Sequence, residues 1–88
     1  MTTTTAIIAK KERETEKAVL VSLRFANTIH NGKIETTTNW IPKSVIESEV
    51  KESFDFVELK EWFIKKLGDE IRIKAGMPRT GGTEIFSL

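Results

Sequence analysis

The sequence predicts an α+β fold: a small, strongly bent antiparallel sheet of three to five strands that carries one short helix. Three observations predict it. Residues 17–25 alternate in polarity with period two, an Asn31-Gly32 turn and a second β-rich run follow, and residues 61–67 have apolar residues at helical spacing. Such a sheet is either open or a partly closed barrel of the SH3-like or OB-like type.

The N-terminal region is rich in threonine and then in charge. Residues 2–9 are β-branched and apolar enough for an edge strand, although the threonines alone are also compatible with a frayed end. Residues 10–16 read as a charged turn. A helix over 9–17 lacks the apolar stripe that a stable helix needs, so we favour the turn.

The strongest strand signal lies in residues 17–25. One parity is wholly apolar and predicts the buried face, while the other is mixed and becomes polar at its end. The apolar parity comprises Val19, Val21, Leu23 and Phe25. Asn31 and Gly32 both tolerate positive φ, so they predict the turn of a hairpin.

The return strand spans residues 34–40. Ile34, Thr36, Thr38 and Trp40 share one parity, which we assign to the core with Trp40 closing a rim. Pro42 cannot donate to a ladder, so the strand is expected to end or to become an edge there. Residues 43–46 then read as a helical turn with Pro42 at its first position.

The second half predicts a strand over 54–59 and a helix over 61–67 closed by Gly68. A longer helix that begins at Phe56, with Asp55 as its N-cap, fits the sequence equally well. Residues 71–74 alternate as in a last edge strand. The predicted core comprises Val19, Val21, Leu23, Phe25, Ile34, Phe54, Phe56, Trp62, Phe63 and Leu67.

One domain is expected over residues 1–76, followed by a flexible tail over 77–88 in which Ile85, Phe86 and Leu88 are apolar enough to dock. The 88 residues include no cysteine, which excludes disulfides and thiolate sites and favours a cytoplasmic location. No apolar run approaches the length of a membrane span, and the N-terminus does not resemble a signal peptide.

Catalysis finds little support in the sequence. His30 has no neighbour at triad or metal spacing, and Glu12, Glu14 and Glu16 fall in a charged turn that projects into solvent, whereas a catalytic dyad needs one desolvated carboxylate. Gly81-Gly82 lacks the lysine and the helix of a phosphate loop. We therefore expect no enzyme, no metal and no cofactor.

Binding is the broad class that remains. The net charge of +1 gives no global case for a polyanion, but aromatic residues among lysines are typical of single-strand binders. Core packing explains the two tryptophans at least as well. The candidate contacts to nucleic acid or to a partner are Trp40, Lys43, Lys60, Lys65 and Lys66.

Three segments resemble a family of small uncharacterised proteins encoded by bacteriophages, prophages and plasmids. They are E-T-E-K-A-V-L-V at 14–21, W-I-P-K-S-x-I at 40–46 and E-W-F-I-K-K-L-G at 61–68, and the resemblance covers about residues 5–68. The long hairpin at 27–33 and the segment after Gly68 depart from the family pattern. The resemblance implies a mobile genetic element but no functional residue.

The function that we expect is a non-enzymatic binding module of a mobile genetic element that acts on nucleic acid or on a nucleic-acid-processing complex. The alternative is an inhibitor or adaptor that binds a host or phage protein through the edge at 2–9 or through residues 85–88. The sequence does not indicate the oligomeric state.

Overall fold

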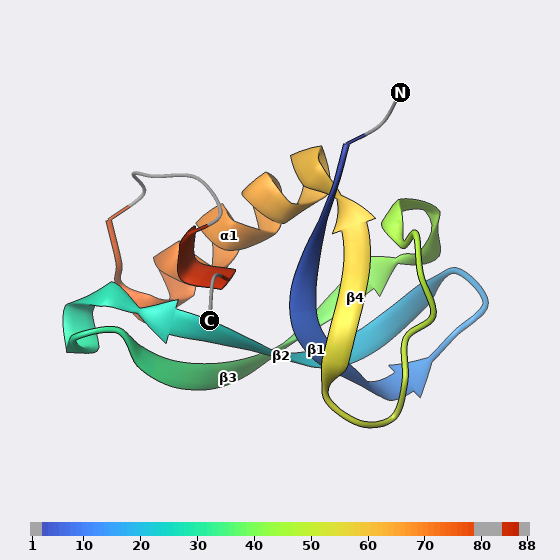
Figure 1. The fold of residues 1–88 in the computed structure, drawn as a ribbon, viewed down its shortest axis with the longest axis horizontal. Coiled ribbons are helices and arrows are strands. Elements are labelled where there is room, and N and C mark those ends of the chain that lie inside the picture. The colour runs from blue at the N-terminus through green and yellow to red at the C-terminus, as the bar shows by residue number, and fades with distance from the viewer. Residues whose placement is uncertain (1–2, 79–83, 87–88) are drawn as a thin grey trace.

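The computed structural model describes residues 3–78 and 84–86 and confirms the α+β class. Four antiparallel strands form one sheet in the order β3-β2-β1-β4, and one α-helix covers one of its faces (Figure 1). The elements are β1 (Thr4–Glu14), β2 (Ala18–Asn27), β3 (Lys33–Pro42), β4 (Asp55–Lys60), α1 (Glu61–Ala75) and three short 3-10 helices, η1 (Thr28–His30), η2 (Lys43–Val45) and η3 (Glu84–Phe86).

Strand β1 lies in the interior of the sheet, which corrects the expectation of an edge strand and of a charged turn over 10–16. Its first half pairs with β4 and its second half with β2, and Ala9 pairs with both neighbours. The register shifts between Lys11 and Arg13, and such a bulge lets a long strand bend. The charged residues of this stretch therefore continue the strand as far as Glu14.

The sheet is strongly bent but does not close into a barrel (Figure 1). An isolated bridge between Ile46 and Leu59 joins the segment after β3 to β4. The β2–β3 hairpin turns at Asn31 and Gly32, whose φ values of 55° and 75° confirm the predicted turn. Its loop is a turn of 3-10 helix, Thr28–His30.

The core lies between the sheet and α1, on what we call the inner face. The apolar parity of β2 faces it as predicted, with Val19, Val21, Leu23 and Phe25 all buried. From α1 come Phe63, Ile64, Leu67 and Ile71, and the other strands add Ile7, Ala9, Ile41, Val57 and Leu59. One helix thus covers one face of the sheet and leaves the other without a covering helix.

The predicted parity of β3 and β4 is wrong. Ile34 is 50% exposed and Phe56 is 67% exposed, whereas Ile41 of β3 and Val57 of β4, at odd-numbered positions, are buried. Leu20 pairs with Trp40 and Ala26 pairs with Ile34, so the even-numbered residues of β3 share the mixed face of β2. Side chains of directly paired residues lie on the same face of a sheet, and this pairing places Trp40 outside the core.

The helix is longer than predicted and replaces the last edge strand. Gly68 is buried inside α1, and the C-cap is Gly76, whose φ of 73° lets its N–H reach the carbonyls of Arg72 and Ile73. Ile71 follows Leu67 at helical spacing and is buried, while Trp62 is 58% exposed, which corrects its assignment to the core. Phe56 lies in β4, so the longer helix that begins at this residue is wrong.

The segment expected as a tail contributes to the core where the structure describes it. Met77, Ile85 and Phe86 are buried, and η3 packs against β2. The buried Arg72 of α1 forms an ion pair with Glu84 at 3.5 Å, which ties η3 to the helix. Leu88 and the Gly81-Gly82 pair lie outside the described residues. Within the described ranges, no helix is long and apolar enough to cross a membrane.

Candidate functional site

The uncovered side of the sheet, which we call the outer face, displays large apolar and aromatic side chains. Trp40 is 49% exposed, and Ile34 and Phe56 are exposed as well. The same face receives Ile8, which pairs with Phe56, and Thr36, which pairs with Arg24. The three exposed residues lie on the edge strands β3 and β4, and exposed apolar side chains are a common mark of a binding surface.

Next to β4, the outer face brings one aromatic ring and two cations together. The Arg24 guanidinium carbon lies 4.0 Å from the Phe54 ring centroid, and Lys10 Nζ lies 5.2 Å from it. Phe54 is half-buried and precedes β4, Lys10 comes from β1 and Arg24 from β2. Both distances fall within the range of cation–π attraction, so the ring holds the two cations near the sheet surface.

One hydrogen bond and one ion pair hold the Glu12 carboxylate beside this cluster. The Ser22 hydroxyl donates to Glu12 Oε2 over 2.5 Å, and Lys10 forms an ion pair with the same carboxylate at 3.7 Å. Arg24 itself is exposed. The arrangement therefore presents a guanidinium and aromatic rings to solvent from strands held in a fixed register.

The structure separates the sequence-predicted contacts. Trp40 lies on the outer face near β3's C-terminal end, while Lys65 and Lys66 are exposed on α1, the element that covers the inner face. Lys60 ends β4 and forms a 3.9 Å ion pair with Glu47. Lys43 binds Glu14 over 2.5 Å. These four lysines do not join Trp40 in one site.

Sequence reasoning missed the cluster of Phe54, Lys10 and Arg24. A sequence signal existed for Arg24, because it is a charged residue on the mixed face of β2, between the buried Leu23 and Phe25. Lys10 was not identifiable because the charged stretch that contains it resembled a turn. Its pairing with Ser22 of β2, in the same register as Ala9 with Leu23, places Lys10 on the outer face.

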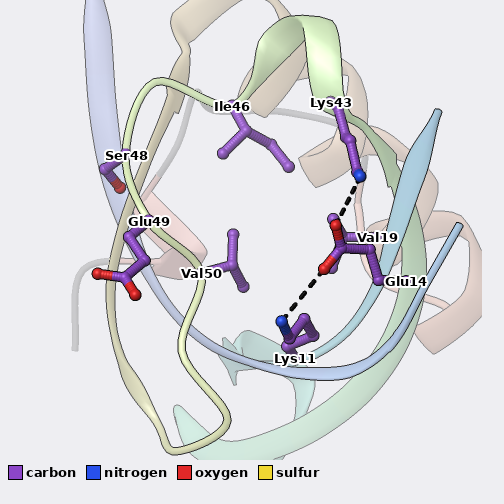
Figure 2. Close-up of a pocket in the computed structure, with 8 residues that line it drawn as sticks. All are labelled: Lys11, Glu14, Val19, Lys43, Ile46, Ser48, Glu49 and Val50. Atoms are coloured by element: carbon purple, nitrogen blue, oxygen red, sulfur yellow. Dashed lines mark hydrogen bonds and ion pairs between the residues drawn. The ribbon is translucent and has the colours of Figure 1, made fainter. Parts of the chain in front are cut away.

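A hollow of about 350 Å³ opens at the end of the inner face, between the β1–β2 turn and residues 43–50 (Figure 2). Lys43 and Lys11 both reach the Glu14 carboxylate there, at 2.5 and 3.1 Å, above an apolar lining that includes Val19, Ile46 and Val50. The hydrogen bond from Lys43, followed by that from Lys11, lowers the pKa of Glu14. A carboxylate that two ammonium groups keep ionised is a poor proton acceptor. We therefore interpret Glu14, Lys43 and Lys11 as an ion-pair cluster.

Other chemistry has little foundation in the described residues. No group of three or more His, Cys, Asp or Glu in ranges 3–78 and 84–86 is placed to hold a metal ion. His30 is exposed in η1, in the hairpin loop. No protein-family model, curated protein or solved structure matches this chain.

Proposed function

We propose that this protein is a non-enzymatic binding module of a mobile genetic element, and that it holds single-stranded nucleic acid on its outer face. The observation that supports the proposal most directly is the cluster in which Phe54 stacks with Arg24 and Lys10, beside the exposed Phe56. Aromatic rings and cations on an open sheet surface provide stacking platforms for bases and charges for the phosphate backbone.

The exposed aromatics favour unpaired bases over a duplex. Phe56 at 67% and Trp40 at 49% exposure offer flat ring surface on which an unstacked base can stack, whereas a base inside a duplex cannot. Thr36 and Thr38 lie between Ile34 and Trp40 on the same face of β3 and add hydroxyl groups. A duplex hides its base faces, so we expect weaker binding to double-stranded DNA.

The charge of the chain sets the expected strength. A net charge of +1 and two outer-face cations near Phe54 allow only a few phosphate contacts. For single strands, log affinity falls with log salt concentration, and each phosphate contact makes the slope more negative by about 0.7. A few contacts therefore give a weak salt dependence. Stacking would supply much of the affinity, and binding in the micromolar range is expected.

The test is a fluorescence anisotropy titration of labelled single-stranded DNA, RNA and duplex DNA at two salt concentrations. Phe56→Ala is expected to weaken single-strand binding about fivefold or more, since base stacking on an aromatic ring contributes about 1–3 kcal/mol. The double variant Lys10→Gln/Arg24→Gln is expected to weaken binding and to flatten its salt dependence.

The matched control is Lys65→Gln/Lys66→Gln, which removes the same charge from exposed positions of α1. It is expected to leave binding nearly unchanged. Equal losses in the two double variants would contradict the outer-face assignment and indicate a general effect of charge. Absence of binding at low salt would reject the proposal as a whole.

A second candidate function, binding to another protein, is favoured by the free edge of β3. In the N-terminal segment, residues 4–9 already pair with β4, and Ile85 and Phe86 are already buried. Strand β3 pairs only with β2 among the described elements. Binding through that edge is expected to tolerate salt, because main-chain hydrogen bonds rather than charges would hold the partner.

A further inference from the structure

The two edges of the sheet differ in how they are protected. On the β4 edge, Ile46 bridges to Leu59, the Glu47 N–H donates to the Glu58 carbonyl over 2.8 Å, and the Glu58 N–H donates to Ser48 Oγ over 2.9 Å. At the opposite edge, no strand in the described part of the chain pairs with the side of β3 that faces away from β2. A bare edge strand is a template for another strand.

One hydrogen bond identifies which backbone groups of β3 are exposed to solvent at the free edge. The Lys43 N–H donates to the Lys17 carbonyl over 2.9 Å, and these residues continue the register that pairs Pro42 with Ala18. Hydrogen-bonded pairs alternate along an antiparallel ladder, so the odd-numbered residues of β3 bond to β2. The N–H and C=O groups of its even-numbered residues therefore point away from β2, toward the free edge of the sheet. Pro42, which has no N–H, falls at an even position, as an edge strand requires.

Between Lys33 and Pro42, the edge carries few of the devices that usually prevent pairing. The β2–β3 register runs from Ala18–Pro42 to Asn27–Lys33 without a shift, so no bulge twists the edge away. Between Lys33 and Pro42 the only charged residue is Glu35, whose odd position places it on the inner face. Two of the outward-directed residues, Ile34 and Trp40, are large and about half exposed.

We propose that the chain forms a symmetric dimer in which β3 pairs antiparallel with β3 of a second copy, about a two-fold axis at Thr37. In this register Ile34 lies opposite Trp40 of the second copy, and Thr36 lies opposite Thr38. All four outward-directed residues then exchange hydrogen bonds. A shift of two residues in one direction sets Ile34 against Pro42, which lacks an N–H, and in the other direction sets Trp40 against Gly32 in the turn.

A second copy fits this edge because the pattern is self-complementary. The exposed Ile34 and Trp40 lie at equal distances on either side of Thr37. A two-fold axis at Thr37 therefore packs Ile34 of each copy against Trp40 of the other.

The dimer joins two four-stranded sheets into one continuous sheet with both outer faces on the same side. The inference goes beyond the proposed function and does not depend on it, since the dimer is measured without nucleic acid. An interface built from one strand and its side chains lies at the small end of specific interfaces, so we expect a dissociation constant in the micromolar range.

The first test is sedimentation velocity over protein concentrations from micromolar to millimolar. The expected result is a rise from the monomer mass of 10.0 kDa toward twice that value. Two matched variants test the register. Thr36→Glu/Thr38→Glu sets like charges opposite each other and is expected to weaken dimerisation at least tenfold, whereas Thr36→Glu/Thr38→Lys sets opposite charges together and is expected to preserve it.

Single cysteines test the two-fold axis directly, because the natural sequence has none. Thr37→Cys places two thiols opposite each other in a non-hydrogen-bonded pair, where the Cβ atoms lie close enough for a disulfide. Mild oxidation is expected to cross-link this variant rapidly and to cross-link Thr36→Cys or Thr38→Cys slowly. A wild-type chain that stays monomeric at every concentration would overturn the proposal, and so would equal cross-linking rates at the three positions.

Discussion

The two faces of the sheet are built from the same strands, yet they differ in what covers them. Along β4, Leu59 and Val57 are 0% and 1% exposed on the inner face, while Phe56 between them is 67% exposed on the outer face. One helix and one short 3-10 turn are enough to cover one side of a four-stranded sheet. The exposed apolar residues of the outer face therefore contribute little to folding, and the proposed function assigns them a role in binding.

The largest expected effect separates the two faces within a single strand. Leu59→Ala is expected to lower the free energy of unfolding by about 2–5 kcal/mol, because it removes a fully buried side chain and leaves a cavity. Phe56→Ala, in the same strand, is expected to change it by less than about 1 kcal/mol, since most of that ring is already in water. Urea denaturation of both variants measures the contrast.

Equal losses of stability in the two variants would break the comparison. They would indicate that Phe56 is covered in solution, and the candidate interface would then be part of a core. The dimer of β3 strands does not produce this result, because Phe56 lies in β4 at the other edge of the sheet.

The next effect concerns the 3-10 turn that completes the inner face. Phe86 is 6% exposed and belongs to the same core cluster as the sheet residues. Phe86→Ala is expected to lower the free energy of unfolding by about 3 kcal/mol. The measurement is again urea denaturation, with Trp62→Ala as a control of comparable size on the exposed side of α1. A loss below about 0.5 kcal/mol would mean that η3 contributes little to the core.

The sequence predicted the elements whose signals are local. The apolar parity of β2, the Asn31-Gly32 turn and the α+β class are all confirmed. Each depends on alternation or turn chemistry within a few residues, and a single covered face of β2 makes that alternation clear.

The wrong predictions concern residues whose burial or secondary structure is determined by tertiary contacts. Strand β3 lies at the edge, so its inner positions Glu35, Thr37 and Asn39 need not be apolar, and the larger outward residues misled the parity assignment. Gly68 resembled a helix stop, but its helix continues because Ile71 packs on the sheet. The Phe54 cluster combines side chains from β1, from β2 and from the residue before β4, and no local pattern encodes their meeting.

A smaller effect is expected where the chain leaves the helix toward the inner face. Gly76 has a φ of 73° and caps α1 just before the buried Met77. A Cβ at this position meets no atom within 4 Å, so the cost of Gly76→Ala is that of the left-handed backbone, about 1 kcal/mol. Gly76→Asn is expected to cost less because asparagine tolerates that conformation. Thermal denaturation compares the two, and equal costs would contradict a backbone origin.

The smallest effect concerns the uncovered end of the inner face, where ion pairs line the hollow. Lys43 and then Lys11 lower the pKa of Glu14 below its ordinary value of 4.5 (Figure 2). A lowered pKa in the folded state stabilises the fold above the ordinary value, and this contribution disappears as the pH falls through the lowered one. The melting temperature of Glu14→Gln is therefore expected to lie slightly below that of the wild type at pH 7 and to converge with it in acid.

Salt separates this explanation from a packing effect. The Glu14 carboxylate is exposed to solvent, so added salt is expected to shrink the difference in melting temperature at pH 7. Glu16→Gln removes the same charge from the adjacent β1–β2 turn and controls for net charge. A difference between Glu14→Gln and the wild type that persists unchanged in acid and in high salt would show that Glu14 acts through its shape. The inner face would then depend on packing at both of its ends, and not only where α1 covers it.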